Sequence, residues 1–251
     1  MKLPIVKKIS SIELVRINSG YYFNFPFKKK IPGGGFVRMI DCMPRIITCK
    51  TLRADEAIVQ AARVSYGETS KGVEADTKLI KYLMKHGHST PIECIQFKFH
   101  IKCPIFVQRH IVKHRMTTMN EISGRYTQIK DEFYIPEKMR YQSKKNKQGG
   151  QQLVECRTSE ELKNTSMKNI KKNYQIYQEM INKGISKETA RMFLPQNIFT
   201  EFYLKIDLHN LFHFLRLRND SHTQYETRQY AAVMEEMIKI TNPISSNHFR
   251  Q

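Results

Sequence analysis

Residues 110–126 hold the densest group of side chains that could bind or transform a charged ligand. They include two histidines, a lysine, two arginines, an asparagine, a glutamate, a serine and a tyrosine. Arginine guanidinium groups form planar forks that match a phosphate or a uracil-like imide. The backbone amides of residues 122–124 offer further donors, and Gly124 allows a ligand to approach the backbone closely. These residue types predict a binding site for a phosphorylated ligand. The plain structural alternative is an exposed helix end followed by a polar hairpin.

The same stretch resembles the signature of the flavin-dependent thymidylate synthases. That signature runs Arg-His-Arg, then several residues, then Asn-Glu-x-Ser-x-Arg-Tyr. Here residues 113–115 read Lys-His-Arg and residues 120–126 read Asn-Glu-Ile-Ser-Gly-Arg-Tyr. Further blocks agree with the family in the same order, at residues 61–65, 82–93, 190–191, 194–195 and 215–222. The resemblance covers residues 45–240.

The resemblance implies reductive methylation of dUMP to dTMP, a methyltransferase step of de novo nucleotide biosynthesis. In this family 5,10-methylenetetrahydrofolate donates the carbon, and FAD reduced by NADPH supplies the hydride, so the flavin carries the redox step. The family needs no cysteine nucleophile on the uracil ring, which makes Ser123 a binding residue. The resemblance also implies a homotetramer whose active sites draw residues from more than one chain.

The resemblance assigns site residues by position. Arg218 takes the catalytic position near the uracil N3 and O4, where an arginine stabilises the negative charge that develops as the ring is activated. The dUMP-binding positions are His110, Lys113, Glu121, Ile122, Ser123, Gly124, Arg125, Arg191 and Arg218. The FAD-binding positions are Ser65, Thr90, Lys113, His114, Arg115, Glu121, Asp207, His209 and His213. On the folate and nicotinamide side of the flavin, the resemblance places His88 and Tyr126.

Four of these positions depart from the family pattern. Lys113 replaces the first arginine of Arg-His-Arg, and a lysine cannot form a bidentate fork. His110 stands where glutamine is common, and His209 and His213 stand where an arginine and an asparagine are common. Contacts at these positions are therefore expected to differ from those of the family.

The histidine substitutions also create two His-x-x-x-His pairs, which begin at His110 and His209. Each pair places both rings on one helix face, as a metal site requires. The rival enzyme is therefore a metal-dependent nucleotide phosphohydrolase. Such a site would also need clustered carboxylates, and only Glu121 and Asp207 are near in sequence, so no metal is predicted.

The net charge of +19, from 42 basic and 23 acidic side chains, creates a field that concentrates polyanions. Basic residues gather at 28–30 and again at 138–147, and tyrosines are interleaved with lysines over residues 134–147. A nucleic-acid-binding protein is therefore the non-enzyme alternative, although it leaves the signature unexplained. Solvated loops would also account for both basic runs.

The hydrophobic patterns predict the elements that must position these residues. Alternating residues predict strands over residues 11–17, 45–51 and 92–101, and the Pro-Gly-Gly-Gly run at 32–35 predicts a turn. Helical spacing predicts helices over residues 54–64, 74–86, 104–114, 160–183, 186–194, 208–217 and 225–240. In the first of these, Asp55 is expected to complement the helix dipole. Residues 139–159 read as a lysine-rich insertion loop.

These elements predict an α+β fold, a single domain with a mainly antiparallel sheet flanked by helices and a helical second half. We expect residues 1–40 to form an N-terminal extension without an assigned function, and residues 41–251 to form the synthase-like domain. No apolar stretch is long enough to span a bilayer, and the five scattered cysteines suggest neither a disulfide framework nor a zinc site. We therefore expect a soluble, intracellular, cytoplasmic protein, or one of the host-cell cytoplasm if its source is viral.

Overall fold

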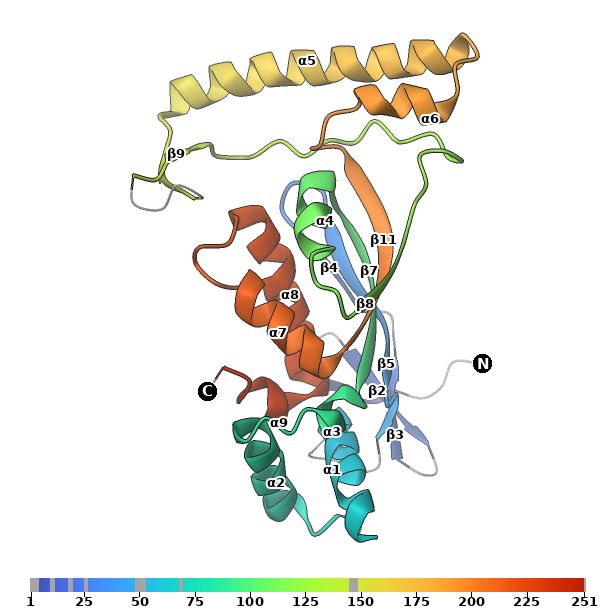
Figure 1. Ribbon diagram of the computed structural model, residues 1–251, viewed down its shortest axis with the longest axis vertical. Helices are drawn as coiled ribbons and strands as arrows, with labels where there is room; N and C mark the ends of the chain where they lie inside the picture. The colour runs from blue at the N-terminus through green and yellow to red at the C-terminus, as the bar shows by residue number, and fades with distance from the viewer. Residues whose placement is uncertain are drawn as a thin grey trace.

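The computed structural model describes residues 5–9, 12–17, 20–24, 27–47, 53–67, 70–144 and 149–250. Its centre is a five-stranded antiparallel sheet with a group of helices along one side (Figure 1). The α+β class with a mainly antiparallel sheet is therefore confirmed. No helix in this described part of the chain is both long and apolar enough to cross a membrane.

The main sheet brings together strands that are far apart in the sequence. Its order is β4 (Phe27–Lys30), β5 (Phe36–Met43), β7 (Gln96–Pro104), β11 (Phe199–Asp207) and β8 (Thr117–Glu121). The expected turn at residues 32–35 joins the first two strands, and Gly33 and Gly34 adopt positive φ there, which only glycine does without strain. The expected domain boundary at residue 40 falls inside β5.

Apolar and polar residues alternate along the central strands because only one face of the sheet is covered. In β7, Phe97, Phe99 and Ile101 are fully buried against the helices. On the opposite face, Lys98 and Tyr203 are exposed. Among the described residues, helices α4 (Ile105–Ile111), α7 (Leu208–Arg218) and α8 (Tyr225–Thr241) pack on the buried face (Figure 1).

The other elements form two further groups at the ends of the sheet. At one end lie the 3-10 turns η1 (Arg53–Asp55) and η2 (Val64–Tyr66) and the helices α1 (Glu56–Arg63), α2 (Val73–Lys85), α3 (Thr90–Glu93) and α9 (Pro243–Ser246). At the other end, the long helix α5 (Cys156–Asn182) lies across the top, above α6 (Lys187–Ala190) and η3 (Arg191–Phe193) (Figure 1). Ser186 caps α6, because its side chain accepts a hydrogen bond from the Thr189 amide.

Two small sheets complete the structure. One has the order β1 (Ile5–Ile9), β2 (Ile12–Ile17), β3 (Gly20–Asn24) and β6 (Ile46–Ile47). The other is a two-stranded pair, β9 (Arg140–Gln142) and β10 (Gly150–Leu153). The strand expected over residues 45–51 is described only at β6, and residues 48–52 lie outside the described part.

Three sequence predictions were wrong in detail. The strand expected from residue 92 begins at Gln96, because Thr90–Glu93 form a helical turn. The stretch expected to be a loop at residues 139–159 contains the β9–β10 hairpin and the start of α5. The second half, which was expected to be helical, also contains the β9–β10 hairpin and β11, and β11 lies inside the main sheet and pairs along its length with β7.

Candidate active site

Arg218 lies at the centre of the first group of predicted site residues. It is the last residue of α7, and its Nε donates to His114 Nε2 at 3.1 Å while its Nη2 donates to the His110 carbonyl at 3.2 Å. These two bonds fix the guanidinium against the end of α4. Its Nη1 forms no hydrogen bond with any described residue. The fixed guanidinium therefore keeps donors for a ligand.

His114 is an uncharged hydrogen-bond acceptor for Arg218. Burial is the largest cause that lowers its pKa to about 4, and the electrostatic interactions with Arg218 and then with His213 act in the same direction. The ring is therefore neutral at pH 7, and because Nε2 accepts from Arg218, the proton resides on Nδ1. His110 turns its ring elsewhere, with Nδ1 at 2.9 Å from Thr227 Oγ1, and burial followed by the Arg218 charge lowers its pKa. The two rings of the first His-x-x-x-His pair thus have different partners.

A cavity of about 360 Å³ opens beside Arg218. Its lining includes the cationic side chains of Lys113, Arg115 and Arg218, together with His114 and His213. A cationic cavity of this kind suits a phosphate or pyrophosphate group. The other two predicted flavin positions in this region lie at the start of α7. Asp207 caps that helix by accepting from the Asn210 amide at 2.9 Å, and His209 follows in the first turn.

The second group of predicted residues forms a turn after β8. Ser123 Oγ accepts from the Arg125 amide at 3.3 Å, and Gly124 is buried beneath Arg191. A methyl group on Gly124 would lie 3.2 Å from the Arg191 Cδ, so glycine is what allows the arginine to lie across the turn. Arg125 Nε pairs with Glu188 at 2.5 Å, and both side chains are about half exposed. Such a surface pair contributes little stability, so an anionic ligand can displace the glutamate.

Several residues that support this turn were not predicted from the sequence. Glu121 Oε1 accepts from Thr200 Oγ1 at 2.5 Å, and its Oε2 accepts from Gln108 Nε2 at 3.1 Å. Lys187 Nζ donates to the Tyr126 carbonyl at 3.0 Å. No pattern pointed to Thr200 or Gln108, since both act through contacts distant in sequence. A helix was predicted from residue 186, and Lys187 is the first residue of α6.

The third group lies towards the α1–α2 end of the molecule. Ser65, in η2, and His88 and Thr90, around the start of α3, are all exposed. The ring of His88 stacks on Tyr82 at 6.1 Å between centroids. Because α3 packs against α7, Thr90 belongs to the same side of the molecule as His209 and His213.

Strand β8 separates the Arg218 group from the Ser123 turn. His114 precedes this strand and Ser123 follows it, and its five residues extend about 14 Å. The structure therefore brings the predicted residues into groups but does not gather them around one point of a single chain. Among the described residues, no three His, Cys, Asp or Glu side chains gather as a metal site would need.

Comparisons with known proteins identify the family and support the fold. Residues 47–244 match the family model described as thymidylate synthase complementing protein. A flavin-dependent thymidylate synthase of Dictyostelium discoideum is 42% identical over 99% of this chain and 81% of the relative, and one of Thermus thermophilus is 47% identical over 86% and 76%. The solved UMP/dUMP methylase PolB of Streptomyces cacaoi, bound with 5-Br dUMP, is similar with a TM-score of 0.76 and 26% identity, covering 87% of this chain and 95% of that chain.

Proposed function

Because this chain belongs to the flavin-dependent thymidylate synthases, as its signature indicated, we propose that it converts dUMP to dTMP by reductive methylation. In this proposal 5,10-methylenetetrahydrofolate is the carbon donor, and FAD reduced by NADPH is the hydride source. The observation that carries the proposal is the Arg218 guanidinium, which is fixed by His110 and His114 and keeps unused donors at the edge of a cationic cavity.

The residues of the Arg218 group fit the flavin and the uracil ring. Lys113 and Arg115 supply charge that matches the pyrophosphate of FAD, while the neutral His114 orients Arg218 without competing for an anion. When bound, the flavin supplies the hydride. Arg218 would donate to the uracil edge and stabilise negative charge there as the ring is activated.

The Ser123 turn suits the nucleotide phosphate. Arg125 and Arg191 flank it, and Gly124 leaves the backbone accessible beneath the Arg191 side chain. Glu121 accepts hydrogen bonds from Thr200 and Gln108, and these bonds hold the end of β8, and with it the turn, in place. A phosphate bound at this turn would exchange with Glu188 for the Arg125 guanidinium.

The test is an absorbance spectrum of the purified protein, followed by anaerobic reoxidation of its reduced flavin. We expect flavin absorbance, and reoxidation coupled to dTMP formation only when dUMP and methylenetetrahydrofolate are both present. A colourless protein that carries stoichiometric metal and releases phosphate from nucleotides would instead support the rival phosphohydrolase.

We also propose that the active unit is a homotetramer. Since the uracil-facing Arg218 and the phosphate-facing turn lie at opposite ends of β8, a second chain can supply one group to a site begun by the first. Large apolar side chains are exposed around the Ser123 turn, which is typical of a surface that another chain covers. They are Ile122 (40% exposed), Tyr126 (79%), Met192 (72%) and Phe193 (51%).

Replacing Met192 with aspartate should therefore disrupt the assembly. A charge on this exposed apolar patch would have to be buried at the interface, so we expect light scattering to show a mass well below four times 29.7 kDa, together with loss of dUMP-dependent turnover. Val73→Asp is the matched control, because Val73 is 44% exposed at the first position of α2, where an acidic residue is favourable. A tetramer that persists in Met192→Asp would exclude this patch from the interface.

A further inference from the structure

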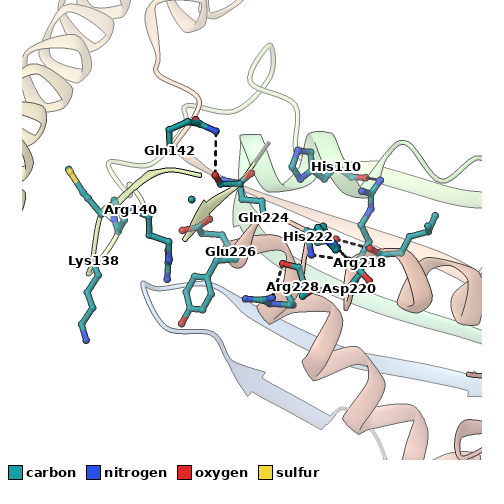
Figure 2. A pocket seen from close by; sticks show the side chains of 18 of the residues that line it. His110, Lys138, Arg140, Gln142, Arg218, Asp220, His222, Gln224, Glu226 and Arg228 are labelled. Atoms are coloured by element: carbon teal, nitrogen blue, oxygen red, sulfur yellow. Dashed lines mark hydrogen bonds and ion pairs between the residues drawn. The ribbon is translucent and has the colours of Figure 1, made fainter. Parts of the chain in front are cut away.

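The two basic runs of the sequence lie in different parts of the molecule. Figure 2 shows Lys138 and Arg140 of the second run in a cleft of about 1150 Å³, and this cleft belongs to the site described above, because His110 and Arg218 also line it. Residues 145–147 of this run lie outside the described part. The first run, residues 28–30, lies in β4 at the edge of the main sheet. The proposed function does not use its charge.

Strand pairing extends this charge across the outer face of the main sheet, which is the face opposite the helices. Lys28 pairs with Arg38, Arg38 with His100, and His100 with Tyr203, so these four residues form one row across β4, β5, β7 and β11. Paired residues point to the same face of a sheet. The row lies on the outer face, because Phe99, the next residue in β7, is fully buried against the helices. Strands lie about 4.8 Å apart, so the row extends about 14 Å.

Three exposed lysines contribute free positive charge to this face. Lys98 and Lys205 pair with each other on β7 and β11, next to the row. The Nζ of Lys98 lies 5.3 Å from the centroid of the Tyr203 ring, and the Nζ of Lys28 lies 3.8 Å from the centroid of the Phe36 ring. None of the three lysines forms an ion pair with a residue that the structure describes. Their charge is therefore available to an anionic partner.

The acidic side chains beside the row already have partners of their own. These pairs are Asp41 with Arg45, Glu201 with His100, and Glu132 with Lys102. Since His100 Nε2 donates to Glu201 at 3.0 Å, its Nδ1 is free to accept from Arg38 Nη2 at 2.7 Å. A neutral ring thus fixes the Arg38 guanidinium, and its buried Nε has no hydrogen-bond partner among the described residues. The row keeps its positive charge.

Aromatic rings stand among these cations. The rings of His100 and Tyr203 are stacked, with their centroids 4.8 Å apart and their planes inclined by 14°. Phe36 meets His100 edge-on at 5.0 Å. Aromatic side chains on a sheet surface provide platforms on which unpaired bases stack, while lysines beside them contact the phosphates. A duplex cannot use such a platform, because its bases are already stacked on each other.

The charges argue against a second copy of this chain as the partner of this face. A twofold contact would bring Lys28, Lys98 and Lys205 close to the same lysines of the copy, and like charges that meet in an interface are unfavourable. The net charge of +19 adds to this repulsion over a longer range. A polyanion is attracted by the same charges.

We infer that the outer face of the main sheet binds single-stranded nucleic acid, with bases stacked on Tyr203 and phosphates contacted by Lys28, Arg38, Lys98 and Lys205. Single-stranded RNA and DNA share these bases and phosphates and differ in the 2′-hydroxyl. None of the five residues belongs to the candidate active site. The inference therefore goes beyond the proposed function and does not depend on it.

The test is the fluorescence anisotropy of labelled oligothymidine and oligouridine of about 15 nucleotides, titrated with the holo protein. Excess dUMP is present throughout, so that the candidate active site is occupied. We expect both strands to bind, and a duplex of equal length to bind at least about fivefold more weakly because it cannot stack on Tyr203. Four phosphate contacts predict a slope of about −3 when the logarithm of the binding constant is plotted against that of the salt concentration.

Two variants separate the charge from the stacking. Lys98→Ala/Lys205→Ala should make the salt slope shallower by about 1.4, since each phosphate contact with a single strand contributes about 0.7. Tyr203→Ala should raise Kd about tenfold and leave the slope unchanged, because the ring stacks on a base and carries no charge. Both variants should keep the wild-type rate of dUMP turnover and the wild-type mass in light scattering.

The matched control is Lys171→Ala/Lys172→Ala, which removes the same charge from the exposed surface of α5 and should keep both Kd and the slope. The inference is overturned if neither strand binds, if excess dUMP abolishes binding, if the duplex binds equally well, or if the control weakens binding as much as Lys98→Ala/Lys205→Ala. A changed mass in that variant would make the face an interface between chains and would also overturn it. The expected binding in a protein without dUMP turnover would support the inference while the proposed function fails.

Discussion

Replacing Arg218 with alanine is expected to leave flavin bound and to lower kcat/KM for dUMP methylation by about 10²- to 10³-fold, as loss of one preorganised donor to a developing charge does. The guanidinium is held by His110 and His114 before any substrate arrives, so under the proposed function its Nη1 would need no rearrangement to donate to the uracil edge. Steady-state kinetics at saturating folate, together with the flavin absorbance of the purified variant, give both quantities.

Arg218→Lys is the matched control, because lysine keeps the positive charge but lacks the planar, forked set of donors of a guanidinium. We expect it to bind flavin like the wild type and to recover only part of the activity, since one ammonium group cannot hold both His114 and the substrate. Unchanged turnover in Arg218→Ala would remove the arginine from the catalytic assignment. Loss of flavin in both variants would instead make Arg218 a flavin-binding residue.

The same variant has a second consequence that a general loss of structure would not produce. Since the Arg218 charge helps to lower the pKa of His114, its removal should raise that pKa from about 4 towards the ordinary value. The burial of the ring, which is the larger cause, would remain. Titration of the His114 ring by NMR in wild type and Arg218→Ala measures the change, and a pKa that falls in the variant would contradict this account.

The signature residues were recognisable in the sequence, but their division between the ends of β8 was not. Residues 113–126 read as one continuous motif, but β8 lies in the middle of this motif and separates Lys113 from Arg125. Spacing along a chain shows which side chains share a face of one element, but not which distant residues they meet. For this reason neither Glu188 beside Arg125 nor Thr200 beside Glu121 could be predicted.

The sequence of β11 contains the alternating pattern of a strand, although no strand was predicted there. Phe202, Leu204 and Ile206 are buried and alternate with the exposed Tyr203 and Lys205, which is the period of a half-covered strand. The nine residues lie between two strongly helical stretches, so the local context favoured helix. The hairpin at β9 and β10 had no such alternation, since it pairs polar residues over a cleft rather than over a core.

Asp55 is the residue whose replacement should affect stability most. It was expected to act on the dipole of α1, but its carboxylate is fully buried and faces the start of α9 instead. There it accepts from the amides of Ile244 and Ser245 at 2.7 and 3.3 Å and from the Ser245 hydroxyl. Asp55→Ala would leave these buried donors without partners, at a cost of about 3 kcal/mol in the free energy of unfolding.

For a chain of this size, that loss corresponds to a fall in melting temperature of roughly 6–12 °C. Calorimetry at a fixed protein concentration measures it, because assembly makes the melting temperature depend on concentration. The control is Glu74→Ala, since Glu74 pairs with Lys78 at the exposed surface of α2, and this pair should contribute less than 1 kcal/mol. An equal shift in both variants would show that the buried contacts of Asp55 are not what stabilises the C-terminal region.

Asp55 should also make stability depend on pH in a direction opposite to that of most carboxylates. Burial raises its pKa from 3.8 to about 6, although the hydrogen bonds from Ser245, Ile244 and Asn242 act to lower it. The folded state therefore binds the proton more tightly than the unfolded state. Its contribution is fully present below pH 4 and is lost as the pH rises through about 6, by roughly 3 kcal/mol in total. Asp55→Asn cannot titrate, so urea unfolding from pH 4 to 7.5 should show its stability deficit shrinking as the pH rises. A deficit that grows with pH would mean that the hydrogen bonds outweigh burial and that the pKa lies below 3.8.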